Sequence, residues 1–279
     1  MRSTASPFTD PAQVRGPLYA TATRIASRTS ALHHARVAGR HAAEFITELA
    51  AAADPEPAVI ADIGCGRGTT TLALAKRFPA ARIAAVDLSA SLLTVTRDRL
   101  SGSPASAAVR ADFHRIPLAG ESCALVVAAF CLYHSATPAS AVTEIARCLT
   151  RDGTAIIAVK SADSYRELDH LMTASGLDPA AETRPSLYQA AHSGNITDLA
   201  ATGLSVRQVV HETHRFTFPT LANAAEYLAT SPKYDLPPAL ANSPDTLAAA
   251  LRERLPDSPV QATSVVTYLV AGPKRGTPR

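Results

Sequence analysis

Short apolar runs alternate with helical patterns between residues 58 and 160, and this alternation is the feature that most restricts the fold of the chain. Five runs indicate buried strands, at 58–64, 82–88, 106–112, 123–130 and 153–160. The segments between most of them place apolar residues at helical spacing. Parallel strands need crossover helices that cover both faces of a sheet. The sequence therefore predicts an α/β fold with a doubly wound, mostly parallel sheet, whose ligands bind at the carboxyl ends of the strands.

The segments outside this core complete a single predicted domain over residues 18–272 of the 279. Two apolar runs late in the chain, at 204–218 and 264–272, predict two further strands and bring the sheet to seven. The proline-rich stretch between them predicts a cover over the ligand site. The predicted parts are a flexible arm at 1–17, N-terminal helices at 18–53, the strand core at 57–160, a helical cover with late strands at 161–262, and a flexible tail at 273–279.

Composition and charge narrow the kind of partner. Hydrophobic residues make up 47% of the chain and charged residues 18%, a globular composition that excludes wholesale disorder. The net charge is +3 and is spread without long basic runs, so we expect a small-molecule partner and neither nucleic acid nor a membrane. The start has no apolar signal region and no apolar stretch is long enough to span a bilayer, which predicts a cytoplasmic protein.

The cysteines carry no signal of metal or disulfide chemistry. Cys65, Cys123, Cys131 and Cys148 form no C-x-x-C pair and lie in or beside apolar runs. This pattern favours reduced thiols over disulfides or zinc ligands, and no metal site is predicted.

The most specific local signal is a glycine-rich loop at the first strand-to-helix junction, where Asp62 is followed by Gly64, Gly66 and Gly68. Glycines remove Cβ atoms, so the backbone can approach a ligand closely, and the helix start offers unpaired N–H groups. The nicotinamide pattern G-x-G-x-x-G would need glycine at position 69, where Thr69 stands. The loop therefore disfavours a nicotinamide dehydrogenase, and a tight turn without a ligand is its structural alternative.

The loop sequence ADIGCGRG (61–68) resembles motif I, D/E-x-G-x-G-x-G, of the class I S-adenosylmethionine-dependent methyltransferases. The resemblance continues through AVDLSASLL (85–93), RADFHRIPL (110–118) and residues 130–159, and it covers about 57–160. It implies the Rossmann-like methyltransferase fold, S-adenosyl-L-methionine as the cofactor and S-adenosyl-L-homocysteine as the product.

The same resemblance, carried over residue by residue, implies a cofactor site that begins at the loop. Gly64, Gly66 and Gly68 would line the methionine part of the cofactor, with Asp62 near its ammonium group. An acidic neighbour suits a cationic amine and a sulfonium.

The later strand ends would hold the rest of the cofactor. Asp87 ends the second strand, and its two oxygens would accept hydrogen bonds from both ribose hydroxyls. Leu88, Asp112 and Phe113 would contact the adenine, and Phe130 would lie near the methionine chain. Asp87 is also placed to cap a helix, and Asp112 taken alone could be an ordinary loop acid.

Two further residues are candidates for chemistry and closure. His134 follows the fourth strand, where family members often carry a histidine that faces the acceptor, and an imidazole suits proton removal. A loop-shaping role for His134 is the alternative. Tyr19 resembles an aromatic residue that closes over the cofactor in related enzymes, and plain packing is equally consistent with its position.

Other polar residues near strand ends have a predicted location without a role. Lys160, Asp163 and Tyr165 follow the carboxyl end of the fifth strand, where they would reach a substrate. His211 and His214 lie at odd spacing on a predicted strand, so they point to opposite faces as surface or gate residues.

Three functions follow from these observations. The first is methyl transfer to a small-molecule acceptor in natural-product biosynthesis, because the composition, rich in Ala, Arg and Pro, resembles stand-alone methyltransferases of actinobacterial secondary metabolism. The second keeps the fold without methylation and catalyses cyclisation, elimination or hydrolysis. The third is a non-catalytic partner subunit of a biosynthetic enzyme. The assembly expected is a monomer or homodimer, with a heteromeric partner as an alternative.

Overall fold

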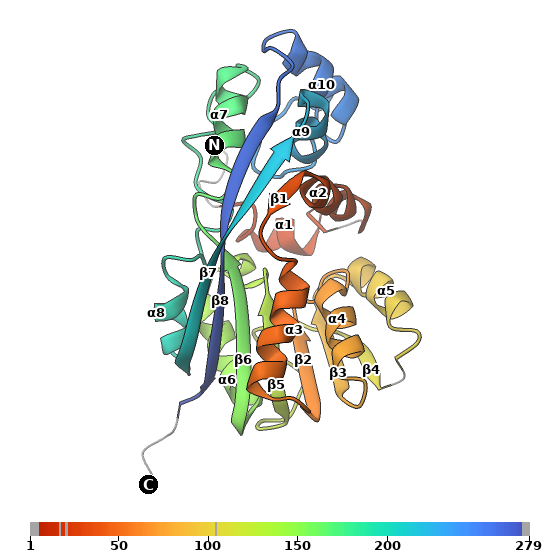
Figure 1. The fold of residues 1–279 in the computed structure, drawn as a ribbon, viewed down its shortest axis with the longest axis vertical. Helices are drawn as coiled ribbons and strands as arrows, with labels where there is room; N and C mark the ends of the chain where they lie inside the picture. The colour runs from red at the N-terminus through yellow and green to blue at the C-terminus, as the bar shows by residue number, and fades with distance from the viewer. Residues whose placement is uncertain (1–5, 17, 20–21, 104, 275–279) are drawn as a thin grey trace.

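The structure is a computed structural model that describes residues 6–16, 18–19, 22–103 and 105–274. A sheet-based core carries a smaller cap at one end (Figure 1). The strands are β1 (Arg36–Ala38), β2 (Val59–Ile63), β3 (Arg82–Asp87), β4 (Ser106–Arg110), β5 (Cys123–Ala129), β6 (Leu149–Lys160), β7 (Leu204–Phe218) and β8 (Val260–Pro273). The helices are α1 (Pro11–Arg15), α2 (Ala22–Ala35), α3 (Ala42–Ala53), α4 (Thr69–Arg77), α5 (Ala90–Arg99), α6 (Pro138–Cys148), α7 (Arg166–Ala174), α8 (Ile196–Ala201), α9 (Leu221–Leu228) and α10 (Pro244–Arg252).

The strands form one sheet in the order β1-β7-β8-β6-β5-β2-β3-β4. β2 to β6 run parallel and β8 pairs antiparallel with β6, which confirms the α/β fold with a mostly parallel sheet. The predicted count of seven strands is wrong by one, because β1 adds an eighth strand that pairs antiparallel with β7. Three residues are too few to show an alternating pattern, so this edge strand leaves no signal in the sequence.

Both faces of the central strands are buried, as a parallel sheet with crossover helices requires. Ile60 and Leu125 pack with α3, α4 and α5 in one apolar core. Their neighbours Ala61 and Val126 point the other way and pack in a second core that includes α6 and α8. The apolar runs are continuous for this reason, and the helices hold the carboxyl ends of the strands in one row.

Local sequence explains where several helices begin. The Ser89 hydroxyl accepts a hydrogen bond from the Leu92 amide, which confirms Ser89 as the cap of α5. Pro138 and Pro244 occupy the first turns of α6 and α10, where a missing N–H costs nothing. These starts place the helices that follow β5 and precede β8.

The cap is built on the long strands β7 and β8, which continue beyond the carboxyl edge of the parallel strands (Figure 1). α9 and α10, which connect β7 to β8 in the chain, pack against each other. α7 packs against β8, and α2 packs against α9. Arg24 on α2 donates from Nε to the Thr230 carbonyl at 3.1 Å. α2 and the late cover therefore form one layer above the sheet, whereas α3 packs against a face of the sheet.

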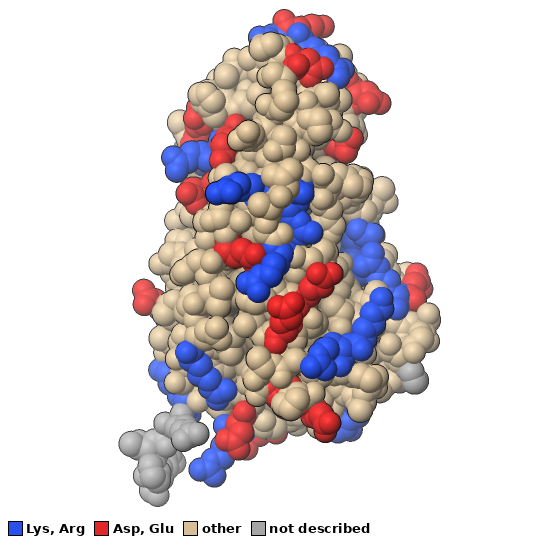
Figure 2. Space-filling view, in the orientation of Figure 1, with Lys and Arg blue, Asp and Glu red and all other residues tan. Residues whose placement is uncertain are grey.

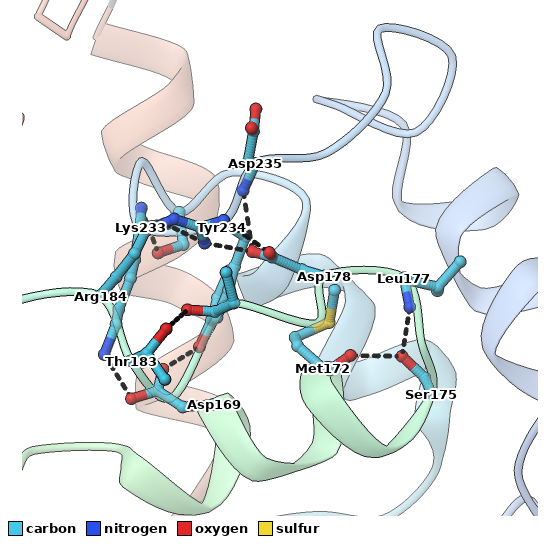
Figure 3. A network of polar contacts seen from close by, with 12 residues as sticks. Asp169, Met172, Ser175, Leu177, Asp178, Thr183, Arg184, Lys233, Tyr234 and Asp235 are labelled. Atoms are coloured by element: carbon cyan, nitrogen blue, oxygen red, sulfur yellow. Dashed lines mark hydrogen bonds and ion pairs between the residues drawn. The ribbon is translucent and has the colours of Figure 1, made fainter. Parts of the chain in front are cut away.

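Two ion pairs with deeply buried carboxylates hold the cap together (Figure 3). Asp169 on α7 accepts from the Lys233 ammonium, and from the Tyr234 hydroxyl at 3.1 Å. Asp178 accepts from Arg184, with 2.6 Å between Oδ1 and Nη2. These bonds join α7, the segment that follows it and the loop after α9 into one unit.

The predicted N-terminal arm lies partly within the described residues. Phe8 is only 4% exposed and contacts the rings of Tyr133 and His134, so residues 6–16 pack onto the core at this point. The mobility of the arm stays a prediction. Residues 1–5 of the arm and 275–279 of the tail lie outside the described residues.

The surface carries both signs of charge. Figure 2 shows basic and acidic side chains interspersed over much of the face that it draws, with a run of basic side chains along its lower right. Within the described ranges, none of the helices is long and apolar enough to cross a membrane. All four cysteines are buried with free thiols, as their sequence context predicts.

Candidate functional site

A cavity of about 520 Å³ lies between the carboxyl edge of the sheet and the cap. Its walls come from the loop after β2, the ends of β3, β5 and β6, the N-terminal segment, and the cap. The only acidic residues that line it, within the described part of the chain, are Asp87 and Asp112. Both lie at the end formed by β3 and β4, so the cavity has an acidic end beside the glycine loop.

The three glycines of the loop have different tasks. All three have positive φ, at 63° for Gly64, 57° for Gly66 and 73° for Gly68. A Cβ on Gly64 would lie 2.4 Å from the Cβ of Cys131, and one on Gly68 would lie 2.9 Å from Thr96, so packing alone requires both glycines. A Cβ on Gly66 would meet nothing within 4 Å. Gly66 therefore leaves a space in the cavity that a ligand can fill.

Asp87 stands directly beside that space. Its Oδ2 accepts from the Gly66 amide and its Oδ1 from the Ser89 amide, both at 2.8 Å. Burial raises the pKa of this carboxyl against the opposing effect of those hydrogen bonds. Each carboxylate oxygen has a second lone pair, so Asp87 can accept two more donors, such as a pair of ribose hydroxyls. Leu88 lines the cavity next to it.

Asp62 and Gly68 do not line the cavity, in contrast to Gly64 and Gly66. The Asp62 side chain is 1% exposed and accepts from the Thr71 hydroxyl at 2.5 Å. Burial raises its pKa to about 7. Asp62 therefore fixes the loop from beneath, and its effect on a ligand acts through space.

Asp112, His114 and Ser135 form a hydrogen-bonded chain beside the acidic end. His114 Nδ1 donates to Asp112 Oδ1 at 2.6 Å, and His114 Nε2 shares a hydrogen bond of 2.7 Å with the Ser135 hydroxyl. The order of the three side chains, acid, histidine and serine, resembles that of a hydrolase triad. Ser135, however, is fully buried, and its oxygen accepts a hydrogen bond from the Thr137 amide. Ser135 therefore positions His114, which lines the cavity with Phe113. Sequence analysis missed His114, although it directly follows Asp112 and Phe113.

Phe130 and Tyr165 line the cavity with left-handed backbone conformations, at φ 56° and 66°. Such conformations cost of order 1–3 kcal/mol in residues other than glycine and persist where the surroundings impose them. The Phe130 amide donates to the Ala158 carbonyl at 2.8 Å, which ties this turn to β6. The two aromatic rings flank Lys160, whose Nζ donates to the Tyr165 hydroxyl at 2.7 Å.

Tyr19 and His134 meet across the cavity, although 115 positions separate them in the chain. His134 Nδ1 lies 3.3 Å from the Phe8 carbonyl, which can only accept, so this nitrogen carries the proton. The Tyr19 hydroxyl then donates to Nε2 at 2.6 Å. Burial lowers the pKa of His134 to about 3. The imidazole is therefore neutral, and both of its nitrogens are engaged.

The sequence-predicted residues thus gather in one cavity, with two exceptions. Tyr19, Gly64, Gly66, Asp87, Leu88, Asp112, Phe113, Phe130 and His134 line it, whereas Asp62 and Gly68 support the loop from outside. His214, which the sequence suggests as a surface or gate residue, is buried and also lines the cavity. Arg28 and Arg36 line it as well, and no sequence motif points to either.

Known proteins provide an independent view of this chain. Residues 61–157 match the methyltransferase domain family. The malonyl-[acyl-carrier protein] O-methyltransferase of Geobacter sulfurreducens is 34% identical over 125 residues, which cover 45% of this chain and 47% of that protein. The trans-aconitate 2-methyltransferase of an Acidovorax species is 31% identical over 135 residues, which cover 48% of this chain and 50% of that protein. The trans-aconitate 2-methyltransferase of Acidovorax ebreus is 29% identical over 212 residues, which cover 74% of this chain and 77% of that protein. The chain therefore spans about half the length of the first two relatives.

Solved structures show the same fold at low identity. The YcgJ protein from Bacillus subtilis has a TM-score of 0.57 and 16% identity, with 85% of this chain and 100% of that chain covered. The [4+2]-cyclase SpnF has a TM-score of 0.52 and 15% identity, with 82% and 81% covered. A TehB-like SAM-dependent methyltransferase from Corynebacterium glutamicum has a TM-score of 0.51 and 17% identity, with 91% and 98% covered.

Residues 61–157 therefore carry a methyltransferase domain, which agrees with the class I S-adenosylmethionine-dependent methyltransferases that the glycine loop resembles. The cofactor of this class is S-adenosylmethionine. The open space at Gly66 beside the Asp87 carboxylate fits a ligand with ribose hydroxyls, so the residues of this chain agree with that cofactor.

Proposed function

We propose that this protein transfers the methyl group of S-adenosylmethionine to a small-molecule acceptor bound in the same cavity. The observation that carries the proposal is the division of the cavity. One end has the open glycine cradle and Asp87, and the other end is enclosed by aromatic side chains from the N-terminal segment and the cap. Its volume of about 520 Å³ falls in the range of small-molecule sites.

The cofactor end has a role for each predicted residue. Asp87 accepts the ribose hydroxyls, Leu88 and Phe113 flank the adenine, and Asp112 accepts from its amino group. Gly64, Gly66 and Phe130 lie along the methionine part, and Tyr19 closes over the cofactor. Asp62 holds the Thr71 hydroxyl beneath the loop, and Gly68 stands at the start of α4.

The reaction needs little from the side chains beyond position. The cofactor supplies a methyl group on a sulfonium, which an acceptor atom attacks in line. The cap and the sheet edge exclude water and hold the acceptor at the required angle. The predicted base, His134, has a pKa lowered to about 3 by burial, which makes it a weak base. We propose that His134 chiefly holds Tyr19 in place, and that proton removal through the Tyr19 hydroxyl is its second role.

The acceptor and its setting are also part of this proposal. Relatives are named for malonyl-[acyl-carrier protein] and trans-aconitate, which supports an organic acceptor. We place the acceptor in natural-product biosynthesis on the composition of the chain alone. The cytoplasmic location and the oligomeric state stay predictions from the sequence.

Calorimetric titration with S-adenosylmethionine, S-adenosylhomocysteine and NAD tests the proposal. We expect micromolar binding of both adenosyl ligands and none of NAD. A screen of acceptors with methyl-labelled cofactor should then yield a labelled product. Adenosyl binding without labelled product from any acceptor would favour the non-methylating alternative, and tight NAD binding would overturn the proposal.

The His134→Gln and Tyr19→Phe variants separate the two roles of His134. A positioning role predicts that both variants weaken cofactor affinity, because each removes the hydrogen bond between Tyr19 and His134. A base role predicts about a hundredfold loss of turnover with unchanged cofactor affinity.

A further inference from the structure

A group of basic side chains lines the cavity at the end formed by β1, β7 and β6. Arg36 on β1 and Lys160 at the end of β6 line this end, together with the imidazoles of His33, His41 and His214. The sheet order separates β1, β7 and β6 from β2 and β3, which carry the glycine loop and Asp87. Arg36 and the three imidazoles therefore lie on elements other than those that carry the glycine loop and Asp87, whereas Lys160 borders Phe130, its Nζ 5.8 Å from the centre of that ring.

Among the residues that the structure describes, neither Arg36 nor Lys160 has an acidic partner. Arg36 donates from Nη1 to the Arg40 carbonyl at 3.0 Å, and Lys160 donates to the Tyr165 hydroxyl. No carboxylate of the described residues lies within ion-pair distance of either side chain. The neighbouring Arg40, by contrast, pairs with Glu212 at 3.3 Å and does not line the cavity. Cations that line a cavity without a counter-charge leave room for an anion.

Two imidazoles in the group have buried nitrogens without hydrogen bonds. His214 is 5% exposed and its Nε2 has no hydrogen-bond partner; the nearest carboxylate oxygen belongs to Glu212, at 3.7 Å. His41 Nδ1 is also buried and unpartnered, and the rings of His41 and His33 lie 5.2 Å apart. A buried polar atom without a hydrogen-bond partner destabilises the folded protein by about 1–3 kcal/mol. A ligand that forms hydrogen bonds with these nitrogens would remove that cost on binding.

Aromatic faces surround the Lys160 ammonium. Its Nζ lies 4.7 Å from the ring centre of Tyr165, 5.5 Å from that of Tyr188 and 5.8 Å from that of Phe130. An anion that pairs with Lys160 must therefore be joined to a body that packs against flat rings. A planar, unsaturated acid fits this requirement better than a flexible aliphatic one.

We propose that Arg36, Lys160 and His214, with His33 and His41, form a carboxylate-binding subsite for a planar, unsaturated acid, and that this acid is the methyl acceptor. The inference rests on the proposed function, which supplies the reaction. The carboxylate of the cofactor's methionine part is the other carboxylate that these cations could bind. The position of the subsite, on the far side of β5 from the glycine loop, favours the acceptor.

Calorimetry on the full chain, saturated with S-adenosylhomocysteine, tests the subsite with matched probes. The probes are benzoate, cinnamate and trans-aconitate, with benzamide and cinnamamide as uncharged counterparts. We expect the protein to bind at least one acid at least tenfold more tightly than its amide. Equal affinity for acids and amides, or no binding of any acid at millimolar concentration, would overturn the proposal.

Variants then assign the site. Lys160→Met and Arg36→Gln should each weaken acid binding by roughly tenfold to a hundredfold and leave the affinity for S-adenosylhomocysteine within a few fold. Lys76→Met and Arg151→Gln remove the same charges from exposed positions and should change neither affinity. A loss of S-adenosylhomocysteine affinity with acid binding intact would assign the cations to the cofactor and overturn the acceptor subsite. Failure of the unaltered protein to bind S-adenosylhomocysteine would instead overturn the proposed function.

Discussion

The two ends of the cavity are built in different ways. The cofactor end uses the ends of β2, β3 and β5, and its main features are backbone conformations and carboxylates within one stretch of chain, residues 62–130. The acceptor end takes side chains from α2, β1, β6, β7 and the segment before α8. One end therefore depends on local geometry, and the other on how distant segments pack.

This difference affects what each end can tolerate. The loop at Gly64 and Gly68 is packed so tightly that a single methyl group would clash. The acceptor end is held from outside, by the cap with its Asp169 and Asp178 ion pairs (Figure 3). Damage to the cap should therefore spare cofactor binding, and damage to the glycine loop should not.

The largest effect is expected from Asp169→Ala in the cap. The change leaves the Lys233 ammonium, whose side chain is 14% exposed, without its carboxylate, and breaking such a buried pair costs about 3–5 kcal/mol. The free energy of unfolding, measured with denaturant, should fall by that amount. Asp163→Ala removes an exposed carboxylate 3.7 Å from Arg166 and should change it by less than about 1 kcal/mol. Equal effects of the two substitutions would show that the network does not hold the cap.

A pH-dependent effect follows from Asp62. Burial raises its pKa to about 7, so the native carboxyl keeps its proton where an unfolded chain, with aspartate pKa values near 3.9, has lost it. The Asp62 contribution to stability therefore falls as pH rises from about 4 to about 7 and is constant above that. Asp62→Asn should reduce this fall by about 2–4 kcal/mol. Denaturation of the wild type and of Asp62→Asn at pH 5 and pH 8 measures the difference. Asp98→Asn, at an exposed position of α5, is the control.

The glycine loop can be probed by two substitutions of the same size. Gly64→Ala places a methyl group 2.4 Å from Cys131 Cβ at a positive φ and should cost about 2–3 kcal/mol of unfolding free energy. Gly66→Ala has the same backbone strain without a clash, so it should cost about 1–2 kcal/mol and weaken S-adenosylhomocysteine binding by filling the cradle. Unchanged affinity in Gly66→Ala would remove this space from the ligand site.

The last expected effect is on the affinity for the cofactor. Asp87→Ala should weaken S-adenosylhomocysteine binding by roughly 1–3 kcal/mol, because hydrogen bonds to the ribose and to the Gly66 amide are lost. Asp98→Ala serves as the exposed control. Calorimetry measures both, and an Asp87→Ala variant that folds and binds like wild type would exclude this residue from the cofactor site.

The sequence predicts the cofactor end well because that end consists of local signals. The apolar runs predict β2 to β6, and Asp87 follows from its place at a strand end. The same reasoning fails for Asp62, whose side chain turns beneath the loop to Thr71. Backbone direction at a strand end is a local property, whereas the direction of a buried side chain depends on the helix packed above it.

The rest of the site has no sequence signal of this kind. β1 is three residues long, yet it places Arg36 at the cavity. Tyr19 meets His134 only because the N-terminal segment folds back over the fourth parallel strand in the chain, β5. Lys160 follows from its place at the carboxyl end of a strand, but nothing in the sequence predicts that Arg28, from α2, lines the same space.

The sequence by itself therefore determined the α/β order of elements, the glycine loop and the class of cofactor, since strand and helix periodicity and turn residues act over a few positions. Only the tertiary structure decided which glycine faces open space, that His134 is a neutral partner of Tyr19, and that unpaired cations lie opposite the acidic end. These properties arise from contacts between residues far apart in the chain. Burial and charge pairing at such contacts depend on the packing of the whole molecule.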